Sequence, residues 1–194
     1  MEKKYYGIIL AIIGIITIGS YYFLSMDNSK EITSISEEGY TSINTENLGK
    51  NLPQVSVALT DSEKEDILYM REEEKLARDV YINLYQKWNI PIFDNISKSE
   101  QTHTDSVKLL IGRYNLTDPA LNEVGKFNNQ ALQSLYDSLI IKGSVSLEDA
   151  LVVGASIEEI DILDLHDAIY NTNKDDITTV YDNLMKGSRN HLRS

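Results

Sequence analysis

The apolar residues of the chain form one uninterrupted run followed by several helical stripes. The run extends over Tyr5–Met26 and contains no charged residue. A helix of this length spans about 33 Å, which is enough to cross a bilayer. Lys3 and Lys4 precede it, so the positive-inside rule places the N-terminus in the cytoplasm. We therefore expect residues 1–26 to be a single-pass anchor in the cell membrane, with the rest of the chain extracytoplasmic; a cleaved signal peptide is the alternative.

The rest of the chain divides into a polar segment and a helical domain. Residues 27–58 are rich in Ser, Thr, Asn and Glu and have no sustained period, which is typical of a flexible linker. Over residues 59–194, apolar residues recur every three or four positions, as in amphipathic helices. No stretch there has the alternation of a β-strand, so we expect an all-α domain.

Helix breakers and capping residues give the expected bounds of five helices. Thr60 or Asp61 caps the first, Pro91 begins the second and Gly143 ends the third. The expected ranges are about 60–88, 91–114, 129–141, 146–170 and 175–191. Four long helices, with the short one in a crossover between the second and the fourth, predict a four-helix bundle.

Ionisable residues stand at positions where the apolar stripes should continue. A carboxylate on the inner face of a bundle costs on the order of several kcal/mol unless it is paired or bound to metal. Because four helices share this feature, a common cationic partner explains it best, and two divalent ions would balance four carboxylates. The predicted metal ligands are Glu74 in the first helix, Glu100 and His103 in the second, Glu158 and Asp161 in the fourth, and His191 in the last.

Composition narrows the choice of metal and of partner. The chain has no Cys, which excludes thiolate zinc sites and iron–sulfur clusters. Oxygen and imidazole ligands suit iron, manganese or zinc. The net charge of −12 disfavours nucleic acid. We therefore expect metal ions as partners besides the membrane and no nucleic acid, and we leave a homodimer open.

Three short segments resemble the metal-binding helices of rubrerythrin. Glu74-Lys-Leu-Ala-Arg78 is similar to the Glu-x-x-Ala-Arg of its first helix, and Glu100-Gln-Thr-His103 to the Glu-x-x-His of its second. The segment from Gly154 through Glu158 to Asp161 resembles its third helix.

Two longer strings extend the resemblance to a family. Through Glu72–Tyr81 and Gly187–Arg193, residues 59–194 resemble the ferritin-like DUF2202 proteins, a family whose name leaves the activity open. The resemblance implies a ferritin-like four-helix bundle that binds iron, as one ion or two.

The last helix departs from the implied pattern. A second Glu-x-x-His is expected there, and the chain has Ser188-Arg-Asn-His191. A mononuclear site, an asymmetric pair and compensation by Asp161 all stay open. The expected function is iron-dependent oxidation or the detoxification of peroxide or O2. The alternative is a non-catalytic bundle, with a degenerate site, that binds a metal or a partner.

Overall fold

The described part of the chain is predominantly helical. The computed structural model describes residues 31–36, 40–55 and 57–194. Its bundle helices and the helix packed on them are α3 (Asp61–Trp88), α4 (Pro91–Arg113), α5 (Gln130–Gly143), α6 (Leu147–Asn171) and α7 (Asp175–His191). The helices expected over residues 59–194 are confirmed, with bounds close to the expected ones.

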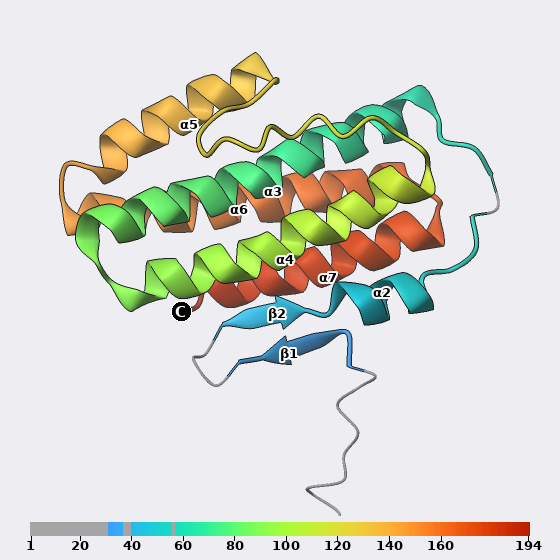
Figure 1. Ribbon diagram of the computed structural model, residues 1–194, viewed down its shortest axis with the longest axis horizontal. Coiled ribbons are helices and arrows are strands. Elements are labelled where there is room, and N and C mark those ends of the chain that lie inside the picture. The colour runs from blue at the N-terminus through green and yellow to red at the C-terminus, as the bar shows by residue number, and fades with distance from the viewer. Residues whose placement is uncertain (1–30, 37–39, 56) are drawn as a thin grey trace, which may run out of the picture. The chain divides into compact units, whose positions relative to one another are not determined.

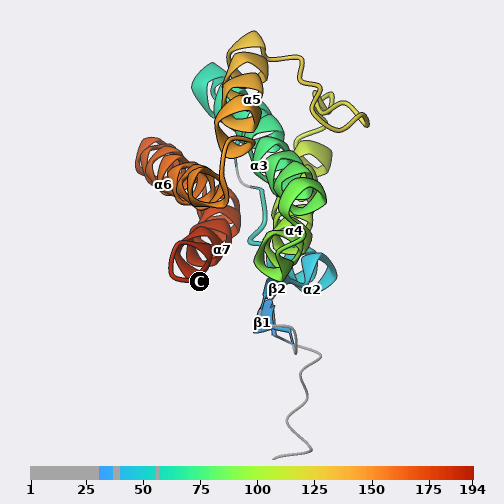
Figure 2. The same ribbon diagram turned by 90° about the vertical axis from the view of Figure 1, so that its left-hand side faces the viewer.

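Four of these helices form the bundle. Figure 2, which looks along the helices, shows α3 and α4 on one side and α6 and α7 on the other. Because α4 and α6 run in the same direction, the chain returns along the bundle between them, and α5 lies in this return, against α3 and α6 (Figure 1). The expected helical crossover is therefore present.

Residues at the two ends of α3 determine where this helix begins and ends. Thr60 Oγ1 accepts a hydrogen bond from Glu63 N, and the Glu63 carboxylate accepts one from Thr60 N, which forms a capping box. At the other end Asn89 adopts a left-handed φ of 52°, a conformation that Asn tolerates better than most residues. Pro91 then begins α4 at a position where its missing N–H is not needed. These signals produce a tight turn that brings α4 back along α3.

Two apolar clusters fill the bundle, and a polar layer separates them. On α3 the first cluster ends at Met70 and the second begins at Leu76. On α4 the corresponding boundary residues are Val107 and Ile96. The residues between these boundaries include the predicted metal ligands of both helices. The fold therefore places the ligands in one cross-section, with hydrophobic packing on either side to support it.

The interpretation of residues 27–58 as a flexible linker is wrong for the described residues of that segment. They form the antiparallel strands β1 (Thr33–Ile35) and β2 (Thr41–Ile43) and the helix α2 (Thr45–Asn51). Ile43 and Leu48 are buried in the first apolar cluster. These elements are too short to show a sustained period, so burial against the bundle determines their structure.

Hydrogen bonds fasten β2 to the bundle. Ile43 N donates to Thr102 Oγ1 on α4 at 3.0 Å, and Asn190 Nδ2 on α7 donates to Thr41 Oγ1 at 2.7 Å. The hairpin thus lies against the two helices that carry Glu100, His103 and His191.

The expected location in the cell membrane is contradicted by the described helices. Across the helices of residues 31–36, 40–55 and 57–194, none combines the length and the apolar character needed to span a bilayer. The anchor expected at residues 1–26 lies outside the described residues.

A buried ion pair joins the start of α3 to the turn between α6 and α7. Glu63 accepts hydrogen bonds from Lys174 Nζ at 2.8 Å and from Thr172 Oγ1 at 2.7 Å. Burial would raise the pKa of Glu63, but Lys174, Thr60 and Thr172 lower it to about 2. A carboxyl whose pKa is depressed by folding stabilises the fold above its usual pKa, and this contribution is lost as the pH falls towards 2.

Glu63→Gln should therefore lower the free energy of unfolding at pH 7 by about 1–2 kcal/mol, allowing for solvent screening of the pair. The deficit should shrink as the pH is lowered from 4.5 towards 2, because wild-type Glu63 is then also neutral. Urea unfolding at several pH values measures this, with the exposed Glu65→Gln on the same helix as the control. A deficit that does not change with pH would contradict the assignment.

Candidate metal centre

All six predicted ligands lie in the polar layer between the two apolar clusters. Their burial is nearly complete, and the least buried, His191, is 6% exposed. Their places are Glu74 on α3, Glu100 and His103 on α4, Glu158 and Asp161 on α6, and His191 on α7. Carboxylates buried to this extent need a nearby positive charge.

Glu74, Glu100 and His103 form the first group of converging side chains. His103 Nδ1 lies 3.2 Å from Glu74 Oε2 and 2.9 Å from Glu100 Oε2. Glu100 and His103 are three residues apart, so one face of α4 presents both to α3. Each of the three side chains offers one ligand atom within 4.8 Å of the others, which is close enough for a single ion to bind all three.

Glu100, Glu158 and His191 form the second group. His191 Nδ1 lies 2.8 Å from Glu100 Oε1 and 3.3 Å from Glu158 Oε2. Their ligand atoms also lie within 4.8 Å of one another. Glu100 therefore belongs to both groups, with Oε2 directed to the first and Oε1 to the second. A carboxylate shared in this way is placed to bridge two cations.

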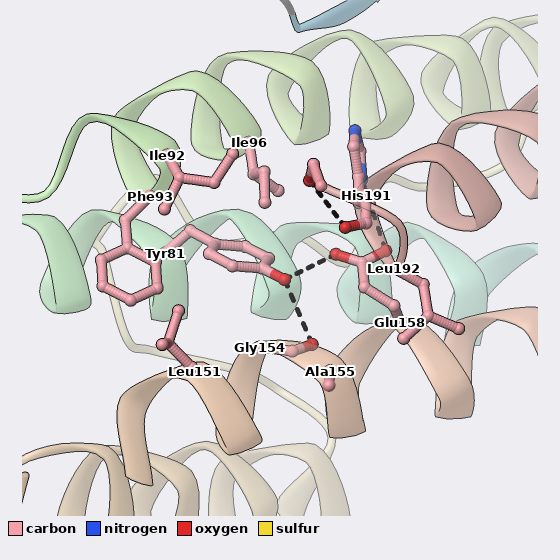
Figure 3. A pocket seen from close by; sticks show the side chains of 11 residues that line it. Tyr81, Ile92, Phe93, Ile96, Leu151, Gly154, Ala155, Glu158, His191 and Leu192 are labelled. Carbon is pink, nitrogen blue, oxygen red and sulfur yellow. Dashed lines mark hydrogen bonds and ion pairs between the residues drawn. The ribbon is translucent and has the colours of Figure 1, made fainter. Parts of the chain in front are cut away.

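Two further side chains orient the second group. Ser99 Oγ lies 2.7 Å from His191 Nε2, which leaves His191 Nδ1 to face the carboxylates. The Tyr81 hydroxyl donates to Glu158 Oε1 at 2.7 Å and also lies 3.1 Å from the carbonyl oxygen of Gly154 (Figure 3). Such contacts fix the orientation of metal ligands in known sites. Neither residue was among the predicted ligands, although Tyr81 lies one helical repeat past Glu74, a spacing that could have pointed to it.

Asp161 is brought into the layer but lies outside both groups. Its Oδ2 accepts a hydrogen bond from Ser188 Oγ at 3.4 Å, and its Oδ1 has no hydrogen-bond partner among the described residues. Asp161 thus faces the position where the expected second Glu-x-x-His would have its carboxylate. Neither group of three ligand atoms includes it.

The ionisable groups of the layer shift one another's pKa values. Burial raises the pKa of Glu74 to about 7, although His103 opposes this. Burial alone would raise the pKa of Glu100, but His103 and His191 hold it well below its usual range. Burial would lower the pKa of His191, but Glu100 and Glu158 raise it to about 9. The two imidazoles therefore carry the balancing charge in the metal-free chain, and a bound metal ion would replace their protons.

Polar atoms without hydrogen bonds provide an independent test of whether a metal fits. Among the described residues, Glu74 Oε1, both oxygens of Glu100, Glu158 Oε2 and His191 Nδ1 are buried and make no hydrogen bond, although Glu100 and Glu158 form ion pairs with His191. Buried polar groups in folded proteins are nearly always hydrogen-bonded or bound to an ion. Carboxylate oxygens and imidazole nitrogens are also the ligands that iron, manganese and zinc accept. The residues present therefore fit a pair of divalent ions.

Gly187 provides the space for the His103 ring. A Cβ added at Gly187 would lie 2.2 Å from His103 Nε2 and 2.5 Å from His103 Cε1. The rings of His103 and His191 stack at 5.4 Å, with 23° between their planes. Any side chain at position 187 would push His103 out of this arrangement. Gly187 is thus a residue of the site that the stripes could not reveal, because it has no side chain.

Gly187→Ala should move His103 and lower the affinity for a divalent metal at least ~10-fold, with a loss of about 1–3 kcal/mol of stability. The matched control is Gly112→Ala on α4, where a new Cβ meets nothing within 4 Å. This control should leave affinity unchanged and stability equal or slightly higher. Calorimetric titration and thermal unfolding of both variants measure the two effects. Equal affinities for both would contradict a role for Gly187 in placing His103.

Comparisons with known proteins agree with this organisation of the chain. The family model described as "Uncharacterized protein domain (DUF2202)" matches residues 63–194. The uncharacterized protein MJ0754 of Methanocaldococcus jannaschii is 54% identical over 137 residues, which cover 70% of this chain and 74% of that protein. A crystal structure of the hypothetical protein MJ0754 superposes with a TM-score of 0.71 at 52% identity, covering 73% of this chain and 81% of that one. The chain therefore belongs to the DUF2202 family.

Proposed function

We propose that this chain is a ferritin-like metalloprotein whose bundle holds two divalent metal ions, one in each of the two groups that share Glu100. The observation that carries the proposal is the position of Glu100, whose two oxygens face His103 at 2.9 Å and His191 at 2.8 Å. Two cations, one on the side of each imidazole, would use both oxygens of this shared carboxylate. The fold, with ligands from four facing helices, is of the kind in which di-metal carboxylate sites occur.

The charge balance supports two ions in place of one. Glu74, Glu100, Glu158 and Asp161 are all in the layer and at most 1% exposed. Two divalent cations neutralise four carboxylates and leave both imidazoles neutral, as metal ligands must be. A single divalent ion would leave two carboxylates to be balanced by protons.

We propose iron as the bound metal, because the proposed activity needs an ion that can be oxidised. Manganese and zinc, which accept similar ligands, are the alternatives. A bound pair of Fe(II) ions supplies the two electrons that, with two protons, reduce one hydrogen peroxide to two waters. The proposed activity is therefore iron-dependent oxidation coupled to the reduction of peroxide or O2.

A small pocket beside the second group fits this activity. It has a volume of about 120 Å³, and its walls include Ile92, Phe93 and Leu151 (Figure 3). Glu158, His191 and the Tyr81 hydroxyl line it as well. Apolar walls favour small neutral molecules over ions, and Tyr81 holds a proton at Glu158 Oε1. The pocket thus suits a reactant of the size of O2 or hydrogen peroxide.

The second candidate function is metal binding without turnover. Ser188 favours it, because this residue replaces the carboxylate of the expected second Glu-x-x-His and each ion then has only three protein ligands in the described site. The two candidates differ in one measurement. The iron-loaded protein either consumes peroxide while its iron is oxidised, or it holds two ions and consumes none.

The number of metal ions bound per chain tests whether Glu100 is shared between two ions. The wild-type chain should bind about two ions of Fe(II) or Co(II) under anaerobic conditions. Glu100→Gln should lose both, whereas Glu74→Gln and Glu158→Gln should each lose one, because each belongs to one group only. Elemental analysis after gel filtration counts the ions, with the exposed Glu159→Gln as the matched control.

Thermal unfolding of the same variants shows whether a loss of metal reflects misfolding. Metal-free Glu100→Gln should still unfold cooperatively but be less stable than the wild type, because it removes the carboxylate that lies between the imidazoles of His103 and His191, and metal should no longer raise its melting temperature. Loss of one ion, and not both, from Glu100→Gln would refute the bridging role. A wild-type chain that binds no metal would refute the function as a whole.

A further inference from the structure

Glu73 is a buried carboxylate that neither group of metal ligands uses. It lies on α3 and is 3% exposed, and its oxygens interact with Tyr69 and Asp164 without a well-formed hydrogen bond to either. An ionised carboxylate held in this way is costly unless a cation balances it. The burial of Glu73 therefore needs an explanation beyond the metal pair.

Glu73 and Asp161 line the same small cavity between α3, α5 and α6. The cavity has a volume of about 10 Å³ and is otherwise walled by apolar side chains such as Leu76, Leu139 and Ile157. This is about the space that one water molecule or one bare ion occupies. Asp161 is 1% exposed and its Oδ1 also lacks a hydrogen-bond partner among the described residues. Two buried carboxylates thus converge on a space of the size of a single ion.

An acidic pocket on the surface is lined by Tyr69 and Asp164, whose side chains interact with Glu73. It has a volume of about 220 Å³ and lies between α3 and α6. Its described lining residues are Asp66, Tyr69, Met70, Asp164, Asp167, Ala168 and Asn171. None of these seven is a Lys, Arg or His, although the exposed His166 reaches Asp167 from outside at 3.3 Å. The pocket therefore presents three carboxylates to solvent-borne cations.

The acids of this pocket and the two buried carboxylates lie on shared helix faces: Asp66 and Glu73 are seven residues apart on α3, and Asp161 and Asp164 are three residues apart on α6. Burial and, after it, the charge of Asp164 raise the pKa of Glu73 well above its usual range. Burial and the charges of Glu73 and Asp164 likewise raise the pKa of Tyr69. The acidic groups thus form a continuous series from the surface pocket to Glu74.

We propose that this series is the entry route by which a divalent cation reaches the metal pair. Asp66, Asp164 and Asp167 collect the hydrated cation in the pocket between α3 and α6. Glu73 and then Asp161 bind it in turn as it moves inward to Glu74. The inference rests on the proposed function, because a route needs a metal site at its end.

The pocket beside Tyr81 is a poor alternative route for a cation. Its walls include Ile92, Phe93, Ile96 and Leu151, and a hydrated ion gains nothing from such a surface. Carboxylates, by contrast, replace the water ligands of a divalent cation one at a time. The two pockets thus serve different species: the acidic one admits the metal and the apolar one admits a small neutral reactant.

The experiment measures how fast the metal-free full chain takes up Co(II), whose visible absorption reports binding to carboxylates and imidazoles. Stopped-flow mixing compares the wild type with Glu73→Gln and Asp164→Asn. Both variants should load about 10-fold more slowly, while the final number of ions per chain stays at the wild-type value. Asp182→Asn is the matched control, because it removes one exposed acid on α7 that lies outside the series. The control should load at the wild-type rate.

Salt gives a second readout of the same route. Loading of the wild type should slow as ionic strength rises, and Asp164→Asn should respond less because it has lost part of the attraction. Circular dichroism checks the fold of each variant, and if Glu73→Gln does not fold, the partly exposed Asp164→Asn decides the result.

The possible results of this experiment distinguish a failure of the proposed entry route from a failure of the proposed metal site. Wild-type loading rates in both variants would overturn the route and leave the metal pair standing. Loss of an ion from Glu73→Gln, with the remaining ion binding at the wild-type rate, would make Glu73 a ligand and would also overturn the route. A wild-type chain that takes up no Co(II) would overturn the proposed function itself.

Discussion

The structure depends on one constraint: several carboxylates are enclosed in the middle of a helical bundle. Four of them lie in the polar layer of the candidate metal site, and Glu73 adds a fifth beside it. Desolvation of so many like charges opposes folding unless positive charge accompanies them. In the described chain the nearest such charges are the imidazoles of His103 and His191, which their carboxylate neighbours hold protonated. A pair of divalent cations would satisfy the same requirement more completely.

The apolar clusters on either side of the layer make this arrangement tolerable. They provide the burial that stabilises the bundle, so the layer itself does not have to. They also keep water away from the ligands, which strengthens every electrostatic interaction between them. The two apolar clusters thus stabilise the four helices, while the polar layer between them holds the ionisable groups.

Small residues decide how closely the ligand-bearing helices approach one another. Gly187 on α7 leaves space for His103, and Gly154 on α6 lies against the Tyr81 hydroxyl, where a Cβ would come within 3.2 Å of it. Ser188 occupies the position of an expected carboxylate and contacts Asp161 instead. The site is therefore asymmetric: the carboxylate of the last helix is absent, and an acid on α6 faces the place where it would be.

The sequence by itself determined the helices of residues 59–194 and the six buried ionisable residues, because both follow from the spacing of apolar and polar positions along single helices. A stripe interrupted by Glu74 or by Glu100 and His103 can be recognised without knowledge of the partner helix. The elements β1, β2 and α2 of the expected linker at residues 27–58 were not predicted, because their few apolar residues form a pattern only when they pack against the bundle. Only the tertiary structure decided which of the predicted ligands lie together, since this depends on distances between helices. It separated Asp161 from both groups, assigned Glu100 to both, and revealed Gly187, Ser99 and Glu73, whose roles come from what lies opposite them.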